Sequence, residues 1–139
     1  MFETLLPLAG WLYPNYVSAE RQIELVTRQK ALNFAPGDEH LYSNSGYLLL
    51  AHIVKRVTGS SLREWAAENI FGVLGMKNSH FHDDHTHIVP FRADGYAPTE
   101  DGFSISMTIL DMVGDGGVYT TVEDFLLWDR NFYENELGG

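Results

Sequence analysis

The sequence has 139 residues, which is enough for one domain with a hydrophobic core. Hydrophobic residues make up 45% of the chain and aromatic residues 13%, a composition typical of globular rather than disordered proteins. Nine basic residues stand against 19 acidic ones, and the net charge of −10 argues against nucleic acids and anionic membrane surfaces as partners. The absence of cysteine from the sequence excludes disulfides, thiolate metal sites and cysteine nucleophiles.

The first 17 residues contain two prolines and four large aromatic residues without a clear period. They predict an irregular lead segment over 1–17 that needs a surface to pack against. The apolar stretch Leu5–Tyr13 is broken by Pro7 and Gly10 and has no basic residue before it. We therefore expect neither a signal peptide nor a membrane span here, and an export signal of a longer parent protein would lie upstream of Met1.

Two helices are predicted in the first half of the chain. Ser18 is a suitable N-cap for a helix over 19–31, which ends at the turn formers of 35–38. A second helix is predicted from Ser45 or Gly46 to Thr58. Its apolar residues cover most of the circumference, which predicts a central, buried helix that Gly59 terminates.

Capping patterns predict two further helices. Ser61-x-x-Glu64 is a capping box that opens one of them, and the overlapping patterns at 120–124 open the last. Between these helices, residues 77–118 mix turn formers with short apolar pieces, and we expect a loop-rich segment with one short β-ribbon at most and a glycine turn at 114–117. The tryptophans are predicted to be core anchors, namely Trp11, Trp65 and Trp128.

The most specific motif is Tyr42-Ser43-Asn44, which follows the turn at 35–38 and precedes the apolar helix. The run Leu32–Gly59 around it resembles the second motif block of the serine β-lactamase and penicillin-binding protein superfamily, on the class C β-lactamase, D-aminopeptidase and esterase branch. The resemblance continues through Ile70–Met76 and Gly116–Asp124. It implies one partial domain over 1–139, mainly α with irregular loops, which is the helical subdomain of an α+β parent whose central sheet is largely absent.

Proteins of this superfamily transfer an acyl group to a serine and then to water. The resemblance implies that Tyr42 moves the proton and that Asn44 orients the catalytic lysine and the substrate amide. A phenol acts as a base near neutral pH only beside cations that favour its ionised form. In the family that cation is chiefly the lysine of a Ser-x-x-Lys motif. The alternative is structural, with Tyr42 packed under the helix and Asn44 as the N-cap.

The other two motif blocks of the family are missing from this sequence. None of the three lysines has a serine three residues before it or Thr-Gly after it, and no histidine has glycine two residues on. We therefore expect an incomplete piece of a serine hydrolase that is inactive alone. The alternative is a non-catalytic binding or scaffold module derived from the same fold. The parent would be periplasmic or extracellular and would act on a small acyl substrate, and its orphaned apolar surface predicts a homo-oligomer of this chain.

Four histidines and two aspartates lie within eight residues, at His80, His82, His85, His87, Asp83 and Asp84. Such residues could bind zinc or nickel. They lack the His-x-x-x-His spacing of a helix, and the stretch resembles a surface connection of family members. We therefore expect a surface loop without a metal, and we expect no cofactor. The glycine run 114–117 lacks the Lys-Ser/Thr of a phosphate-binding loop and is predicted to be a turn near the Tyr42 loop.

Overall fold

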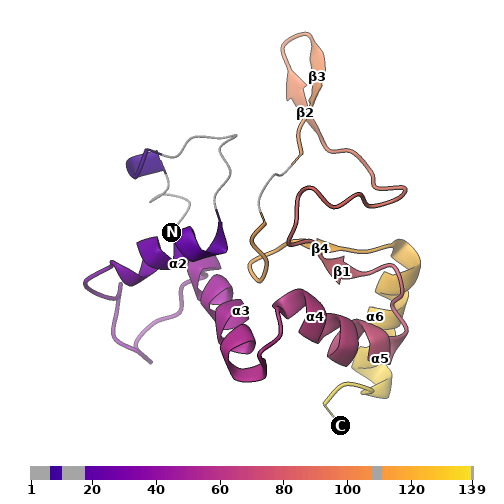
Figure 1. The fold of residues 1–139 in the computed structure, drawn as a ribbon, viewed down its shortest axis with the longest axis horizontal. Coiled ribbons are helices and arrows are strands. Elements are labelled where there is room, and N and C mark those ends of the chain that lie inside the picture. The colour runs from indigo at the N-terminus through magenta and orange to yellow at the C-terminus, as the bar shows by residue number, and fades with distance from the viewer. Residues whose placement is uncertain (1–6, 11–17, 108–110, 139) are drawn as a thin grey trace.

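The computed structural model in Figure 1 describes residues 7–10, 18–107 and 111–138. The predicted lead segment 1–17, with Trp11, lies outside the described residues except for 7–10. The described chain contains helices and two small antiparallel sheets, β1–β4 and β2–β3. The elements are α2 (Ala19–Thr27), α3 (Asn44–Thr58), α4 (Leu62–Ala66), the π-helical turn η1 (Ala67–Phe71), α5 (Gly72–Leu74), β1 (His80–Phe81), β2 (Tyr96–Thr99), β3 (Gly102–Ile105), β4 (Val118–Tyr119) and α6 (Val122–Glu134).

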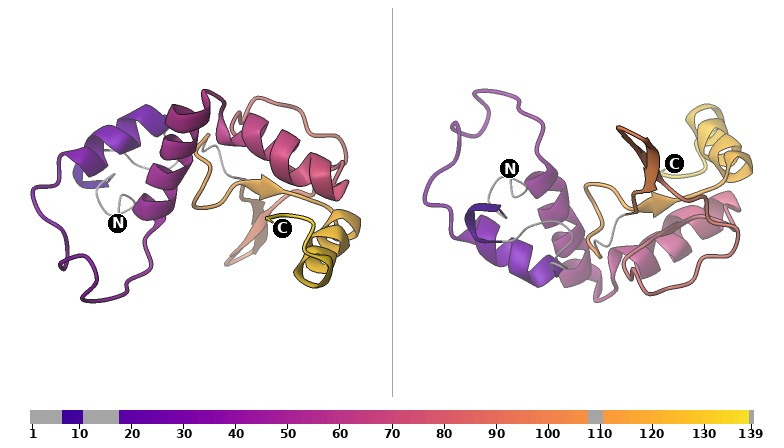
Figure 2. Two further views of the ribbon diagram at one scale, coloured as in Figure 1. Left: turned by 90° about the horizontal axis from the view of Figure 1, so that it is seen from below. Right: turned by 90° about the horizontal axis from the view of Figure 1, so that it is seen from above.

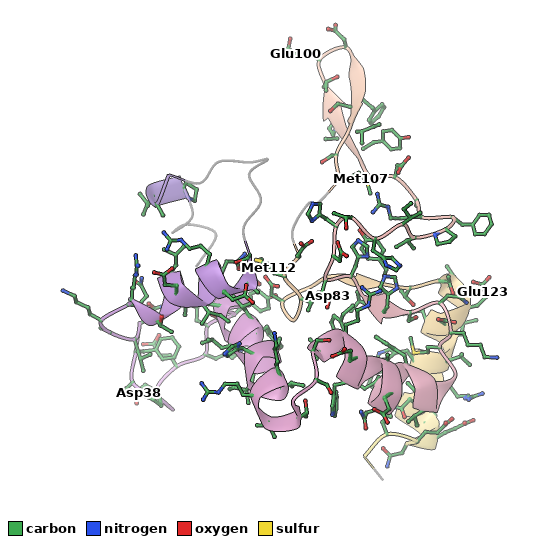
Figure 3. All side chains as sticks on the ribbon, in the orientation of Figure 1. Asp38, Asp83, Glu100, Met107, Met112 and Glu123 are labelled. Carbon is green, nitrogen blue, oxygen red and sulfur yellow. The ribbon has the colours of Figure 1, made fainter. Side chains whose placement is uncertain are left out.

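The elements form two groups that the two views of Figure 2 separate clearly. Helices α2 and α3 form the N-terminal group. Helices α4 to α6 and the β1–β4 ribbon form the C-terminal group, and the β2–β3 hairpin projects away from both, with Glu100 at its tip (Figures 1 and 3). Each group has its own small apolar core.

Helix α2 begins where the sequence predicts and ends four residues earlier. The Ser18 hydroxyl accepts a hydrogen bond from the Arg21 amide at 3.3 Å, as an N-cap does. Ile23 and Val26 pack on the smaller core, whereas residues 27–33 are all exposed, with Leu32 at 73%. A helix extended through these residues would lack packing among the described residues, and short unpacked helices are marginal in water.

Helix α3 begins at Asn44 because the Ser43 hydroxyl accepts from the Gly46 amide at 3.1 Å. It ends at Gly59 with φ 80°, the left-handed conformation that a C-cap glycine adopts. The apolar circumference predicts a central, buried helix, whereas in the described chain the helix is only partly buried. Ser45 and Leu48 are its buried residues, while the apolar side chains of one face are more than half exposed, namely Leu50, Ile53 and Val57.

The predicted capping box at Ser61 is confirmed. The Glu64 amide donates to the Ser61 hydroxyl at 3.1 Å, and the Ser61 amide donates to the Glu64 carboxylate at 2.8 Å. Helix α4 then widens into the π-helical turn η1, where a Cβ on Gly72 would lie 2.8 Å from the carbonyl oxygen of Ala67. This turn therefore requires glycine at 72. The segment buries the larger core, whose members are Ala66, Phe71, Leu74 and Met76.

Helix α6 opens at Thr121, whose hydroxyl accepts from the Asp124 amide at 3.2 Å. The carboxylate of Asp124 is buried and turns away from the helix to accept from the Asn78 amide at 2.7 Å and the Ser79 hydroxyl at 2.8 Å. This links α6 to the segment that leads into β1. Trp128 of α6 packs on the larger core, as predicted, and Trp65 is half-buried.

The loop-rich segment contains more β-structure than predicted. In β2–β3, Tyr96 pairs with Ile105 and Pro98 with Phe103, so these four side chains share one face of the hairpin. All four are exposed. The glycine turn at 114–117 is present, with the Gly114 amide donating to the Gly116 carbonyl at 3.2 Å.

The chain leaves much of its surface uncovered. It has an accessible surface of 10048 Å², whereas a compact monomer of 15.7 kDa exposes about 7,300 Å². Large apolar side chains are exposed on α3, the hairpin and α6 and in the loops between them. Among the described residues, no helix has the length and apolar character that crossing a bilayer requires.

Candidate functional site

The candidate site is the loop that enters α3. The Ser43 hydroxyl caps the helix, so Ser43 rather than Asn44 is the N-cap. Asn44 is the first residue of the helix and is half-buried, while Tyr42 is 64% exposed. The structure therefore does not bury Tyr42 under the helix. Tyr42 and Asn44 therefore flank Ser43, whose side chain caps the helix.

The glycine turn supports this end of α3. A Cβ on Gly114 would lie 2.8 Å from the carbonyl oxygen of Tyr47 and 2.8 Å from the Cβ of Ala51, and Gly114 has φ 121°. Only glycine fits at such a position. The ring of Tyr47 in turn lies 6.0 Å from that of Tyr42. The glycine turn therefore contacts the first two turns of α3, and Tyr47 lies between this turn and Tyr42.

A cavity of about 260 Å³ lies along the same helix, between α2, α3 and the start of α4. Apolar and polar side chains both line it, and the polar ones include Glu20 of α2 and His52 and Lys55 of α3. The pKa of Glu20 lies below its ordinary value, chiefly because backbone and Ser18 hydrogen bonds stabilise the carboxylate, with smaller electrostatic contributions from Lys55 and His52. Sequence reasoning did not find this cavity, since its residues come from five separate segments.

The expectation of a surface histidine loop is wrong for His82. This side chain is only 3% exposed, and its ring stacks on Tyr119 with centroids 4.3 Å apart. His85 and His87 are exposed, as expected. Among the described residues, Asp84, His85 and Asp111 have possible metal-ligand atoms within 4.8 Å of one another. His85 Nδ1 already lies 2.9 Å from the Asp111 carboxylate, which accounts for that group as an ordinary hydrogen-bonded pair.

Comparison with known proteins establishes the family. The Beta-lactamase family model matches residues 5–137, and the chain belongs to that family, which is one of serine hydrolases. A D-aminopeptidase from Brucella anthropi is 31% identical to it over 112 residues, which are 80% of this chain and 21% of the relative. The described elements are accordingly a partial β-lactamase-like fold.

Solved structures agree with this assignment. A penicillin binding protein from Bacillus halodurans is 28% identical, with a TM-score of 0.78 over 98% of this chain and 41% of that one. The octameric penicillin-binding protein homologue from Pyrococcus abyssi is 25% identical, with a TM-score of 0.74 over 94% of this chain and 30% of that one. The chain thus spans about a fifth of the length of the curated relatives it matches.

Proposed function

We propose that this chain is the part of a serine hydrolase that supplies the second catalytic motif. Tyr42 is the proton-transfer group, and Asn44 orients the catalytic lysine and the substrate amide. The whole protein forms a serine ester from a β-lactam, a D-amino-acid peptide or a simple ester, and water then hydrolyses it. The 139 residues alone carry out no acyl transfer, because the sequence contains no Ser-x-x-Lys nucleophile.

The observation that carries this proposal is the exposed phenol of Tyr42, placed directly before a helix that Ser43 caps. A structural tyrosine would be expected under the helix, whereas a proton-transfer group must face the space where substrate and nucleophile meet. Family membership supports the reaction class, and the D-aminopeptidase names of the relatives favour substrates with a D-amino acid.

The exposed apolar surface supports an incomplete domain over a self-sufficient scaffold module. A module that had evolved to stand alone would carry polar residues on the outer faces of its helices. Helix α6 instead packs Trp128 inward and exposes a second apolar face. That face is formed by Val122, Phe125, Leu126, Phe132 and Tyr133, each 59–81% exposed. A helix that is apolar on opposite sides is built to be covered on both.

The DNA on both sides of the reading frame tests the proposal. We expect a Ser-x-x-Lys codon pattern upstream and a Lys-Thr-Gly or His-x-Gly pattern downstream. In the protein that includes them, Tyr42→Phe should lower kcat/KM for a D-amino-acid amide by about 10²–10⁴-fold. The matched control is Tyr133→Phe, because Tyr133 is 81% exposed on α6. Flanks without either motif, or full activity in the Tyr42 variant, would contradict the proposal.

We also propose that this chain, when produced alone, covers its outer apolar faces with a second copy. Contiguous apolar patches beyond a few hundred Å² are uncommon on monomers, and the homologue from Pyrococcus abyssi is octameric. Light scattering at micromolar concentration should therefore give at least twice the monomer mass of 15.7 kDa. A stable monomer that unfolds cooperatively would contradict the incomplete-core argument.

A further inference from the structure

The cavity of about 260 Å³ lies where the two groups of helices meet. Helices α2 and α3 of the N-terminal group line it, and so do Ser61 and Leu62 at the start of α4. Asp83 and Asp111 also line it, and Figure 3 shows Asp83 near the start of α4. Its volume is below the about 300–1,000 Å³ of pockets for drug-sized ligands, so it suits a ligand of about ten non-hydrogen atoms or fewer.

Part of the cavity surface is apolar. Ile23 of α2, Leu48 of α3 and Leu62 of α4 line it, and Ala51 and Val113 add smaller apolar groups. Leu48 is 2% exposed and belongs to the smaller core, so the surrounding residues hold its side chain in place. An aliphatic group of a ligand would leave water on contact with these side chains, which is favourable.

Two of the carboxylates that line the cavity already have basic partners. A carboxylate oxygen of Asp83 lies 2.8 Å from a guanidinium nitrogen of Arg63. A carboxylate oxygen of Asp111 lies 2.9 Å from Nδ1 of His85 and also accepts from the His85 amide at 2.6 Å. These two carboxylates are therefore engaged within the protein.

The other charged groups of the lining have opposite signs and come from different helices. Glu20 belongs to α2, whereas His52 and Lys55 share a face of α3 because they are three residues apart. Hydrogen bonds with its own backbone and with Ser18 chiefly lower the pKa of Glu20, and the nearby Lys55 and His52 lower it further. Within the described part of the chain, no salt bridge joins Glu20 to Lys55. A ligand that carries both charges can therefore fit between them.

The charges of the lining select the charge of the ligand. A purely negative ligand would be repelled by Glu20, Asp83 and Asp111, and a purely positive one by Lys55. A zwitterion pairs with both signs. The charged groups of an α-amino acid lie about 3 Å apart, so with two ion pairs of about 2.8 Å it bridges a gap of up to about 8–9 Å.

We propose that this cavity binds a free α-amino acid with an aliphatic side chain of about the size of leucine. Its carboxylate pairs with Lys55 and accepts a hydrogen bond from His52, and its ammonium group pairs with Glu20. Its side chain lies against the apolar residues of α2, α3 and α4. The bound amino acid thereby joins the two groups of helices. The site requires no acyl transfer, since binding alone is measured.

The test titrates the purified 139-residue chain with L-leucine and, separately, with D-leucine, and follows the backbone amide signals by NMR. For at least one enantiomer we expect saturable binding of one molecule per chain with a Kd of about 1 mM or lower. The signal changes should gather in α2, α3 and the start of α4. Two matched probes each lack one charge: leucinamide has no carboxylate, and 4-methylpentanoate has no ammonium group. Each should bind at least about tenfold more weakly than leucine.

Two variants assign each ion pair to its residue. Lys55→Gln should weaken leucine binding by about tenfold without weakening leucinamide binding, because leucinamide has no carboxylate to lose a partner. Glu20→Gln should weaken leucine binding by about tenfold without weakening the binding of 4-methylpentanoate. The controls are Arg56→Gln, an exposed cation next to Lys55, and Glu123→Gln, which lies in the first turn of α6 as Glu20 lies in that of α2. Both controls should bind leucine as the unchanged chain does.

Three results would overturn the proposal. The first is that neither enantiomer of leucine binds saturably. The second is that leucinamide or 4-methylpentanoate binds as tightly as leucine, because the site would then not recognise a zwitterion. The third is that Lys55→Gln and Glu20→Gln both retain full affinity for leucine, or lose no more of it than the two controls.

Discussion

The two groups of helices differ in how many apolar residues and long-range hydrogen bonds stabilise each of them. The C-terminal group buries four apolar residues in one cluster and adds the hydrogen bonds of Asp124. The N-terminal group buries Leu25 of α2 and a smaller cluster of Leu48 and Met112, and Ile23 and Val26 of α2 pack against that cluster. Figure 3 shows Met112 beside α2. The candidate site at Tyr42 belongs to the thinly packed group.

This difference follows from what the described chain offers each helix. Helices α4 and α6 pack against each other and against the β1–β4 ribbon, so the inward faces of both helices are covered. Helix α3 has α2 on one side and exposes Leu50, Ile53 and Val57 on another. Each large apolar side chain that stays in contact with water forgoes about 1.5–3 kcal/mol of stabilisation that its burial would provide. The candidate site therefore lies in the group that buries fewer apolar residues.

The largest effect is expected in the C-terminal group, from Asp124→Ala. Loss of the carboxylate leaves the Asn78 amide and the Ser79 hydroxyl without their charged acceptor and should lower the free energy of unfolding by about 3 kcal/mol. The matched control is Asp129→Ala, an exposed position on the same helix, which should change it by less than about 0.5 kcal/mol. Equal effects in urea unfolding would show that the buried link does not hold the C-terminal group together.

Native-state hydrogen exchange tests the contrast between the groups directly. Amides of α3 should exchange at least about tenfold faster than those of the α4–α5 segment, which corresponds to an opening free energy lower by about 1.4 kcal/mol. The reason is that the α4–α5 segment supplies Ala66, Phe71 and Leu74 to the larger core, whereas the buried apolar residue of α3 is Leu48. If α3 is protected as strongly as that segment, the two groups form one cooperative unit and the contrast is wrong.

A smaller effect is expected at the junction, where Gly59 ends α3 and Ser61 begins α4. Ser61→Ala removes the hydroxyl that accepts from the Glu64 amide, and caps of this kind contribute about 1 kcal/mol. Ser60→Ala is the control, since the hydrogen bonds of Ser60 within the described part of the chain are made by its backbone. A loss confined to the Ser61 variant, measured by thermal unfolding, supports the capping box; equal losses would remove it from the account.

The smallest effect is a pH dependence from the ribbon histidines. Burial, and then neighbouring cations, lower the pKa of His80 and His82 below the ordinary 6.5. The unfolded chain therefore binds protons first as pH falls, so stability is complete above about pH 6.5 and declines below it. In chelator-treated buffer, His80→Asn should flatten the decline between pH 6.5 and 5, and His40→Asn should not. A decline unchanged by His80→Asn would assign it to other groups.

The sequence predicted what depends on neighbours along the chain. Ser18, Ser61 and Thr121 were identified as caps because a cap acts within three residues, and Gly59 ends α3 for the same local reason. The Tyr42 motif could be recognised because its flanks are contiguous with it. The family that those flanks indicate is confirmed by the match over residues 5–137.

What the sequence did not predict depends on distant segments. The carboxylate of Asp124 reaches Ser79, 45 residues away, and no local pattern indicates that contact. The burial of His82 comes from pairing with a strand that contains Tyr119. The apolar circumference of α3 predicts a buried helix, because a helix of this kind is usually covered on most sides. The described residues cover only part of that circumference.

Intact-mass spectrometry tests the central claim most directly. The claim is that this chain belongs to the β-lactamase family yet holds only the second catalytic motif, with Tyr42 and Asn44. Incubation of the purified 139 residues with penicillin, and separately with a fluorophosphonate, should leave the mass unchanged, because the sequence contains no Ser-x-x-Lys to supply the nucleophile. A stoichiometric acyl or phosphonyl adduct on this chain would contradict the account.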